Sequence, residues 1–225
     1  MKYKLIRSNR KHLAIQITEE GELIARAPKR MPVREIDAFV KQKRQWIEKH
    51  QSRAKMRERM KQSFVMDYGA SVLVLGYEYT IHQENTDRIF LDQKNGFIHM
   101  PSGLSPEEIR LSVIDFYRQL ASDYLTGRVG VYAPKIHVKP AAVKISRASK
   151  RWGSCSGKGN INFSYRLIAA PPDAIDYVVI HECCHLLEMN HSPRFWDHVS
   201  KLCPDYNEMK NKLHAVSERL TMQNL

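Results

Sequence analysis

A five-residue stretch near the C-terminal end, His-Glu-Cys-Cys-His from His181 to His185, constrains the fold of this chain most strongly. Two histidines four positions apart on an α-helix project from the same face, roughly 6 Å apart along the axis, so both imidazoles reach one metal ion. Glu182 lies about 100° around the helix from His181, where a carboxylate can serve as general base in metal-assisted hydrolysis. The stretch therefore predicts a helix that carries a zinc site.

The neighbouring residues test whether this segment is helical. With His181 at 0° and about 100° per residue, the apolar side chains fall between about 140° and 260°, and the polar ones gather on the opposite side. A surface helix with two solvated histidines would leave Glu182 unexplained. We therefore expect one face of the helix in the core and the other in the metal site. The apolar set is Val179, Ile180, Cys183, Leu186 and Leu187.

A third ligand is expected just beyond the helix. His191 stands ten residues after His181, as in the zincin pattern with three histidines. The chain can turn at Asn190, which tolerates left-handed backbone geometry, before Ser192 and Pro193 open another helix. His191 would then lie in the turn and face back toward the other two histidines.

Two features keep alternatives open at this third position. The metzincin pattern has glycine where this chain has Glu188, so the turn is expected later in this chain. Asp205 and Glu208 are rival ligands, at the longer spacing of zincins with a carboxylate ligand. Glu188 is expected to hold a histidine N–H, or to be solvated at the helix end.

Composition is compatible with a globular enzyme. The chain has 225 residues with 43% hydrophobic content, enough to bury a core. It has no run of about 18 apolar residues, and its N-terminus lacks the apolar stretch of a signal peptide, so we expect a cytoplasmic protein without membrane contact. The four cysteines lack paired-ligand spacing, which favours reduced thiols. Cys183 is expected in the core, and Cys184 either packs as a small hydrophobe or lines the site.

The net charge of +12 is concentrated in one segment. The expected role of this segment is the solvated face of a helix, because Ile36, Phe39, Val40 and Ile47 recur at helical spacing beside it. An anionic partner such as nucleic acid, a nucleotide or an acidic protein is the alternative. Nucleic-acid binding is less favoured than a solvated helix face, because no aromatic platform or known binding motif accompanies the charge. The basic residues are Lys41, Lys43, Arg44, Lys49, Arg53, Lys55, Arg57, Arg59 and Lys61, against Glu48 and Glu58.

The N-terminal half favours β-structure around this basic helix. Leu13, Ile15 and Ile17 alternate with polar or small residues, and residues 22–27 return as a second strand, which predicts a hairpin. Three further segments carry β-branched and aromatic residues broken by glycine and asparagine, and they predict a short antiparallel sheet. These segments are residues 71–82, 88–91 and 96–100.

A helix is expected to start at Ser105. Ser105 is a good N-cap, Pro106 suits the first helical position, and Glu108 stands three residues after the cap. The apolar residues that follow recur at helical spacing, so this helix is expected to pack under the metal-binding helix. They are Ile109, Val113, Phe116, Tyr117, Leu120 and Tyr124.

A strand, a loop and a second strand precede the metal-binding helix. Residues 143–147 and 160–167 alternate as strands, and residues 151–159 form the loop between them. A strand with a free edge over a zinc cleft can pair with an extended peptide backbone. The basic residues here could stabilise an oxyanion or bind phosphate, although pairing with Asp or Glu is the commoner role. They are Arg147, Lys150, Arg151, Lys158 and Arg166.

At these residues the chain resembles the YgjP-like metallopeptidase-domain proteins, relatives of the SprT-like and WLM domains. The N-terminal hairpin, its Arg26-Ala27-Pro28 exit and Trp46-Ile47 are similar too, and the Cys183-Cys184 pair departs from the usual apolar or small residues. The resemblance is carried by Arg151-Trp152-Gly153-Ser154-Cys155-Ser156, Gly159-Asn160-Ile161-Asn162, Arg166-Leu167-Ile168, Ala170-Pro171-Pro172, Ile175-Asp176-Tyr177-Val178-Val179, His181-Glu182-x-x-His185-Leu186 and Asn190-His191-Ser192-Pro193-x-Phe195-Trp196.

The resemblance implies an α+β fold, with a zincin-like catalytic domain whose active-site helix lies under a short β-sheet. It implies that His181, His185 and His191 bind Zn²⁺ and that Glu182 is the catalytic base. We expect residues 1–62 to form the N-terminal antiparallel β portion with its basic helix, and residues 63–225 the hydrolase domain, or the two to make one continuous domain.

Three functions are compatible with these features. The first is a zinc peptidase, in which Arg147, Arg151 or Tyr165 stabilises the developing anion. The second is a metal-dependent hydrolase of nucleoside triphosphates such as UTP, an activity that the resemblance also implies. The third, a noncatalytic zinc-stabilised binding module, is disfavoured because structural zinc normally has four protein ligands. The substrate is therefore a peptide or a nucleotide, and the sequence does not fix the oligomeric state.

Overall fold

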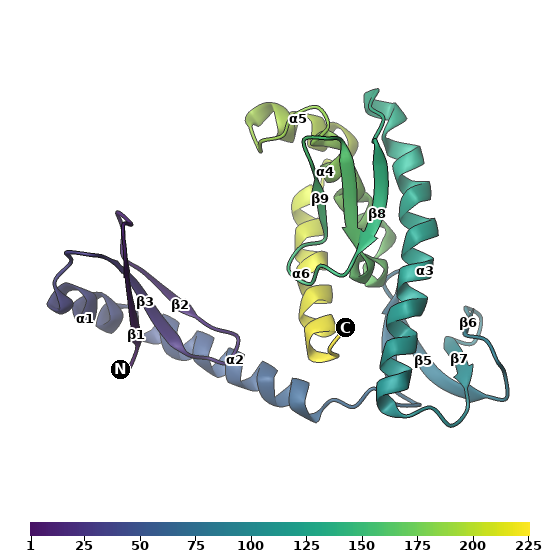
Figure 1. Ribbon diagram of the computed structural model, residues 1–225, viewed down its shortest axis with the longest axis horizontal. Helices are drawn as coiled ribbons and strands as arrows, with labels where there is room; N and C mark the ends of the chain where they lie inside the picture. Colours follow the sequence, from purple (N-terminus) through teal and green to yellow (C-terminus); the bar gives the residue numbers. More distant parts are fainter. The chain divides into compact units, whose positions relative to one another are not determined.

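The computed structural model describes all 225 residues, which form two compact units, Met1–Phe64 and Val65–Leu225 (Figure 1). Each unit has its own sheets and helices, and each is described by itself below. None of the helices combines the length and the apolar character that crossing a membrane requires.

The first unit is a three-stranded sheet covered by two helices. Its central strand β3 pairs antiparallel with β2, which confirms the expected hairpin, and parallel with β1 on its other side. Leu23, Ala25 and Ala27 point from one face of β3 into the core, where they meet Ile36 and Ile47 of the helices. The elements are β1 (Lys4–Ser8), β2 (Ala14–Ile17), β3 (Leu23–Pro28), α1 (Val33–Gln42) and α2 (Arg44–Ser63).

The second unit begins with a four-stranded sheet in the order β4-β5-β7-β6. The strands are β4 (Ser71–Val74), β5 (Tyr77–Glu84), β6 (Phe90–Asp92) and β7 (Phe97–Pro101). The sheet is mixed, so the expectation of a purely antiparallel sheet was wrong. The chain passes from β5 to the outer strand β6, and β7 returns between them, so β7 runs parallel to β5.

The long helix α3 (Pro106–Tyr132) starts where the sequence predicts. The Ser105 hydroxyl accepts a hydrogen bond from the Glu108 backbone N–H, and the Glu108 carboxylate accepts one from the Ser105 N–H at 2.8 Å. This capping box satisfies backbone donors that a helix start leaves unpaired. Ile109, Val113 and Tyr117 are fully buried, and α3 packs as expected against the helix that carries His181.

A three-stranded sheet follows, in the order β8-β10-β9. The expected loop at 151–159 contains the short strand β9, which pairs antiparallel with β10, whereas β8 pairs parallel with β10. Residues 165–167 form a 3-10 turn instead of a strand, because the Ser164 hydroxyl caps the turn by accepting from the Arg166 N–H. The elements are η1 (Pro134–Ile136), β8 (Ala142–Ser146), β9 (Gly153–Cys155), β10 (Asn160–Ser164) and η2 (Tyr165–Ala169).

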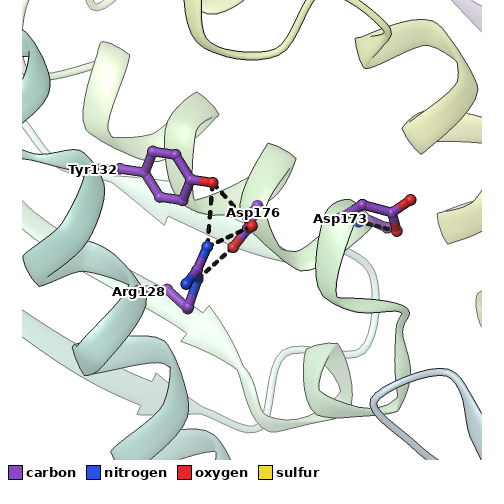
Figure 2. Close-up of polar contacts among 5 residues, drawn as sticks. Arg128, Tyr132, Asp173 and Asp176 are labelled. Carbon is purple, nitrogen blue, oxygen red and sulfur yellow. Dashed lines mark hydrogen bonds and ion pairs between the residues drawn. The ribbon is translucent and has the colours of Figure 1, made fainter.

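Three helices complete the second unit, namely α4 (Pro172–Cys184), α5 (Pro193–Leu202) and α6 (Tyr206–Met222). The helix α4 is central, since it packs against α3, α5, α6 and β9. An ion pair fixes α4 to α3, as Figure 2 shows. The Arg128 guanidinium donates two hydrogen bonds of 2.6 Å to the Asp176 carboxylate, and the Tyr132 hydroxyl donates a third of 2.9 Å.

Candidate metal centre

The C-terminal end of α4 carries His181, Glu182 and His185, the residues that the sequence predicts for a metal site. Its core face is as expected over Val179, Ile180 and Cys183, all buried. Cys184 is also fully buried, which agrees with a small hydrophobe. The helix ends at Cys184, however, so Leu187 leaves the expected core face and is 43% exposed. The helical wheel was wrong at that residue because it extended the helix beyond its true end.

Three imidazoles converge at this helix end. The Nε2 atom of His181 lies 3.2 Å from Nε2 of His185 and 3.1 Å from Nε2 of His191. The ligand atoms of all three histidines lie within 4.8 Å of one another. Tetrahedral zinc with bonds of roughly 2.0–2.1 Å needs nitrogen atoms about 3.3 Å apart. The donor set therefore fits a metal ion such as zinc.

His191 reaches this cluster through a turn of unexpected form. The backbone turns directly after α4, through residues 185–187, and neither Glu188 nor Asn190 has a positive φ. The left-handed turn expected at Asn190 is therefore absent, and the position of Glu188 does not need glycine. The Ser192 hydroxyl then caps α5 by accepting from the Phe195 N–H.

The rival carboxylates stand outside this cluster. Asp205 and Glu208 do not join the group of potential ligands, which consists of the three histidines. Glu208 instead forms an ion pair with Lys212 at 3.1 Å. The residues present therefore favour His191 as the third donor.

Neighbouring groups orient the imidazoles. The Phe195 ring stacks on His185 with centroids 4.5 Å apart, and Trp196 stacks on His191 at 5.8 Å. Nδ1 of His185 lies 3.1 Å from the backbone carbonyl of Glu188. An N–H at Nδ1 donating to that carbonyl leaves the Nε2 lone pair free for a metal. Glu188 thus supports a histidine through its backbone, whereas the side chain was the expected partner.

Burial favours the neutral form of these imidazoles. Burial lowers the pKa of His181 from 6.5 to about 3, with further lowering by the charges of His185, His191 and Lys210. Burial also lowers the pKa of His185, partly opposed by its contact with the Glu188 backbone. Metal binding requires neutral imidazole, so His181 and His185 need not release a proton at neutral pH before they bind.

Glu182 is buried beside the histidines. Its side chain is 5% exposed, and its buried Oε2 atom has no hydrogen-bond partner. A Cβ atom added to Gly153 would lie 2.6 Å from Oε1 of Glu182. The absence of a side chain at Gly153 therefore makes room for the carboxylate. Burial raises the pKa of Glu182 from 4.5 to about 7, and the charge of Arg151 opposes this shift.

A cavity of about 390 Å³ opens beside Glu182 and His181. Its walls come from the start of β9, one face of α4 and one stripe of α6. Burial also raises the pKa of Tyr177 in this wall to about 12, so its hydroxyl keeps its proton. The lining residues are Trp152, Gly153, Tyr177, Val178, His181, Glu182, Lys210, Leu213, His214 and Ser217.

The three residues expected to stabilise a developing anion are placed differently. Arg151 is exposed, and its charge acts on Glu182. Arg147 is exposed and does not line the cavity. Tyr165 is buried in η2, which packs against α3, and its electrostatic neighbours include Arg110, Tyr117 and Arg166. The structure thus does not bring Tyr165 or Arg147 to the histidines.

Sequence reasoning gave no role to several residues of the cavity, among them Lys210 and Gly153. The ammonium of Lys210 lies 4.3 Å from the ring centroid of Trp196 and 4.6 Å from that of Tyr206, within reach of cation–π attraction. No local pattern marks Lys210, because only the packing of α6 on α4 brings it to the site. Gly153 belongs to the Arg151–Ser156 segment that carries the family resemblance, but its position against Glu182 depends on the pairing of β9 with β10.

The α+β fold and the histidine cluster at the end of α4 define a metal-dependent hydrolase of the peptidase-like class. A family model described as "YgjP-like, metallopeptidase domain" matches residues 11–216, so the chain belongs to the YgjP-like family. The metallopeptidase zymogen abylysin of Pyrococcus abyssi is a similar solved structure, with 21% identity and a TM-score of 0.38 over 40% of this chain and 92% of that chain. No curated protein matches the chain.

Proposed function

We propose that this chain is a zinc-dependent metallopeptidase in which His181, His185 and His191 hold the metal and Glu182 is the general base. The observation that carries the proposal is the convergence of three Nε2 atoms beside a buried carboxylate that has no partner of its own. Three protein ligands leave a position for water or substrate, as in catalytic zinc sites, whereas structural sites normally have four. The arrangement therefore favours catalysis over a noncatalytic binding module.

Zinc bound by these histidines would act as a Lewis acid that polarises the scissile carbonyl and activates water for attack. The carboxylate of Glu182 then accepts a proton from the attacking water and returns it to the leaving amine. Burial raises the pKa of Glu182 in the metal-free protein, and the charge of a bound metal ion would lower it again, so the carboxylate would be ionised and able to accept a proton near neutral pH. The absence of a side chain at Gly153 leaves room for the carboxylate, and the cavity that Glu182 and His181 line gives water and substrate access to it.

The cavity and the neighbouring sheet favour a peptide as the substrate. Strand β9 is an edge strand, paired with β10 on one side only, so an extended peptide can add to its free edge through backbone hydrogen bonds. Trp152, Tyr177 and Leu213 offer apolar surface for a substrate side chain next to the scissile bond. Lys210 adds one positive charge to the same cavity.

Nucleoside triphosphate hydrolysis is less well supported by the same cavity. A triphosphate needs several convergent cations, and guanidinium groups are especially suited to phosphate. Arg147 and Arg151 are exposed and absent from the cavity lining. Arg166 is 5% exposed, and its guanidinium donates a 2.6 Å hydrogen bond to the Ser149 carbonyl. Lys210 is the one Lys or Arg side chain of the lining.

A parallel screen of peptide and nucleotide substrates tests the proposal. The zinc-loaded protein and its Glu182→Gln variant are incubated with a proteome-derived peptide library and, separately, with nucleoside triphosphates. We expect new peptide termini from the wild type, none from the variant, and equal zinc content in both. Triphosphate hydrolysis lost in the variant, without peptide cleavage, would replace the peptidase by the nucleotide hydrolase. Turnover that survives in the variant would refute the role of Glu182.

A further inference from the structure

Almost all of the net positive charge of this protein lies in its first unit. Residues 1–64 contain 18 of the 36 lysines and arginines but only 7 of the 24 acidic residues, which gives a formal charge of +11. Residues 65–225 contain the other 18 basic residues and 17 acidic ones, for a charge of +1. The excess of basic residues lies in the unit that does not contain the candidate metal centre. Because a strongly charged surface attracts molecules of opposite charge, this excess points to an anionic partner other than the substrate.

The structure shows that this charge is available to a partner. The unit has few acidic residues with which its cations can pair, and Arg44 pairs with Glu48 at 2.8 Å on the helix surface. Lys49 and Arg53 are exposed on α2 and form no ion pair. Only Ile47 and Ala54 of α2 are buried, so most of this 20-residue helix faces solvent.

The basic helix α2 carries an exposed aromatic platform, contrary to the expectation from the sequence. Trp46 is 41% exposed, and its ring stacks on His50 with centroids 4.0 Å apart and planes 25° apart. At about 100° per residue, Trp46, Lys49 and Arg53 lie within about 60° of one another on the helix surface, so the ring stands beside two free cations. Proteins that bind single-stranded nucleic acid combine these features, with cations along the phosphates and aromatic rings stacked on bases.

We propose that the Met1–Phe64 unit binds nucleic acid without sequence preference, through the stripe formed by Trp46, Lys49 and Arg53 on α2. An anionic membrane is the weaker match, because interfacial helices need a broad apolar face. The exposed apolar side chains of α2 are Trp46, Met56 and Met60, and cations lie between them on the helix surface. The phosphate backbone is common to RNA and DNA, so both are expected to bind.

The test is fluorescence anisotropy of the full-length protein with labelled RNA, single-stranded DNA and duplex DNA, each of about 20 nucleotides or base pairs, at about 50 and 200 mM KCl. We expect micromolar binding at the lower salt. Each neutralised phosphate contributes about 0.7 for single strands and about 0.9 for duplex to the slope of log affinity against log salt. The Lys49→Glu/Arg53→Glu variant should therefore weaken binding about ten-fold or more and flatten this slope. Trp46→Ala should weaken single strands more than duplex, because stacking requires an unpaired base.

A matched variant separates a specific surface from net charge. Lys94 and Lys139 are exposed in the second unit, so Lys94→Glu/Lys139→Glu makes the same charge change elsewhere. We expect this control to change the affinity less than about two-fold, which is smaller than the effect of losing one phosphate contact. Equal losses in the two double variants would overturn the proposed stripe, as would absence of binding at the lower salt. Tighter binding to phosphatidylserine vesicles, lost in the Lys49→Glu/Arg53→Glu variant, would identify a membrane surface instead.

Discussion

Replacing Glu182 by glutamine should stabilise the metal-free protein at high pH while abolishing catalysis. Glu182 is 5% exposed and its Oε2 has no hydrogen-bond partner, so its ionised form is costly in the folded protein. Its pKa is about 7 when folded and 4.5 when unfolded. The unfolded chain therefore ionises first, and the folded state loses stability as the pH rises through this window.

The magnitude follows from the shift of the pKa. A difference from 4.5 to about 7 corresponds to about 3 kcal/mol at pH 8, because one pKa unit is worth about 1.4 kcal/mol. At pH 5 most of this penalty is absent, since the folded carboxyl group is protonated. Glutamine is neutral at both values. The advantage of the variant over the wild type should therefore grow by about 2 kcal/mol between pH 5 and pH 8.

The assay is urea denaturation after removal of metal with a chelator. Trp152 and Trp196 lie in the second unit, and a Trp46→Phe background restricts the fluorescence to that unit. Comparing the two pH values cancels any packing change that glutamine introduces, because such a change does not titrate. A constant difference between the two proteins at pH 5 and pH 8, or one that shrinks with rising pH, would refute the reasoning.

Two further substitutions test the surroundings of the site. Gly153→Ala should lower kcat/KM about 100-fold with unchanged metal content, because its Cβ would displace the Glu182 carboxylate and a catalytic group about 1 Å out of place can cost that much. The Cβ of Gly157→Ala, in the turn after β9, meets nothing within 4 Å, so this variant should keep full activity, and equal losses in the two variants would contradict the proposed clash. Asp176→Asn should lower the free energy of unfolding by about 1–3 kcal/mol, since it leaves Arg128 without its bidentate partner. Asp173→Asn removes the charge that pairs with Lys212 at the surface, whereas the amide oxygen can still accept from the Ala174 N–H, so it should cost less than about 1 kcal/mol. An equal or larger cost there would argue against a special role for the Arg128 pair.

Local patterns predicted what depends on near neighbours in the chain. The capping box at Ser105 and Glu108, the hairpin of β2 and β3, and the core face of α4 all follow from residues a few positions apart. The YgjP-like resemblance is confirmed by the family model over residues 11–216. The ligand roles of the histidines and the base role of Glu182 stay predictions, although the structure brings these side chains together.

Features set by packing between distant segments escaped prediction. The insertion of β7 between β5 and β6 depends on how the sheet assembles, so alternating residues could not reveal it. The end of α4 at Cys184 exposes Leu187, and apolar periodicity alone does not mark where a helix stops. The charges on α2 were visible in the sequence, but the stacking of Trp46 on His50 became apparent only in the structure.

The metal content of purified variants tests the central claim most directly. Wild type and the single variants His181→Ala, His185→Ala and His191→Ala are loaded with zinc, dialysed and analysed by mass spectrometry, with Asp205→Ala and Glu208→Ala as controls. The three-histidine centre predicts about one zinc per chain in the wild type and both controls, and a large loss in each histidine variant. Full zinc content in the His191→Ala variant, with loss in either carboxylate variant, would contradict it.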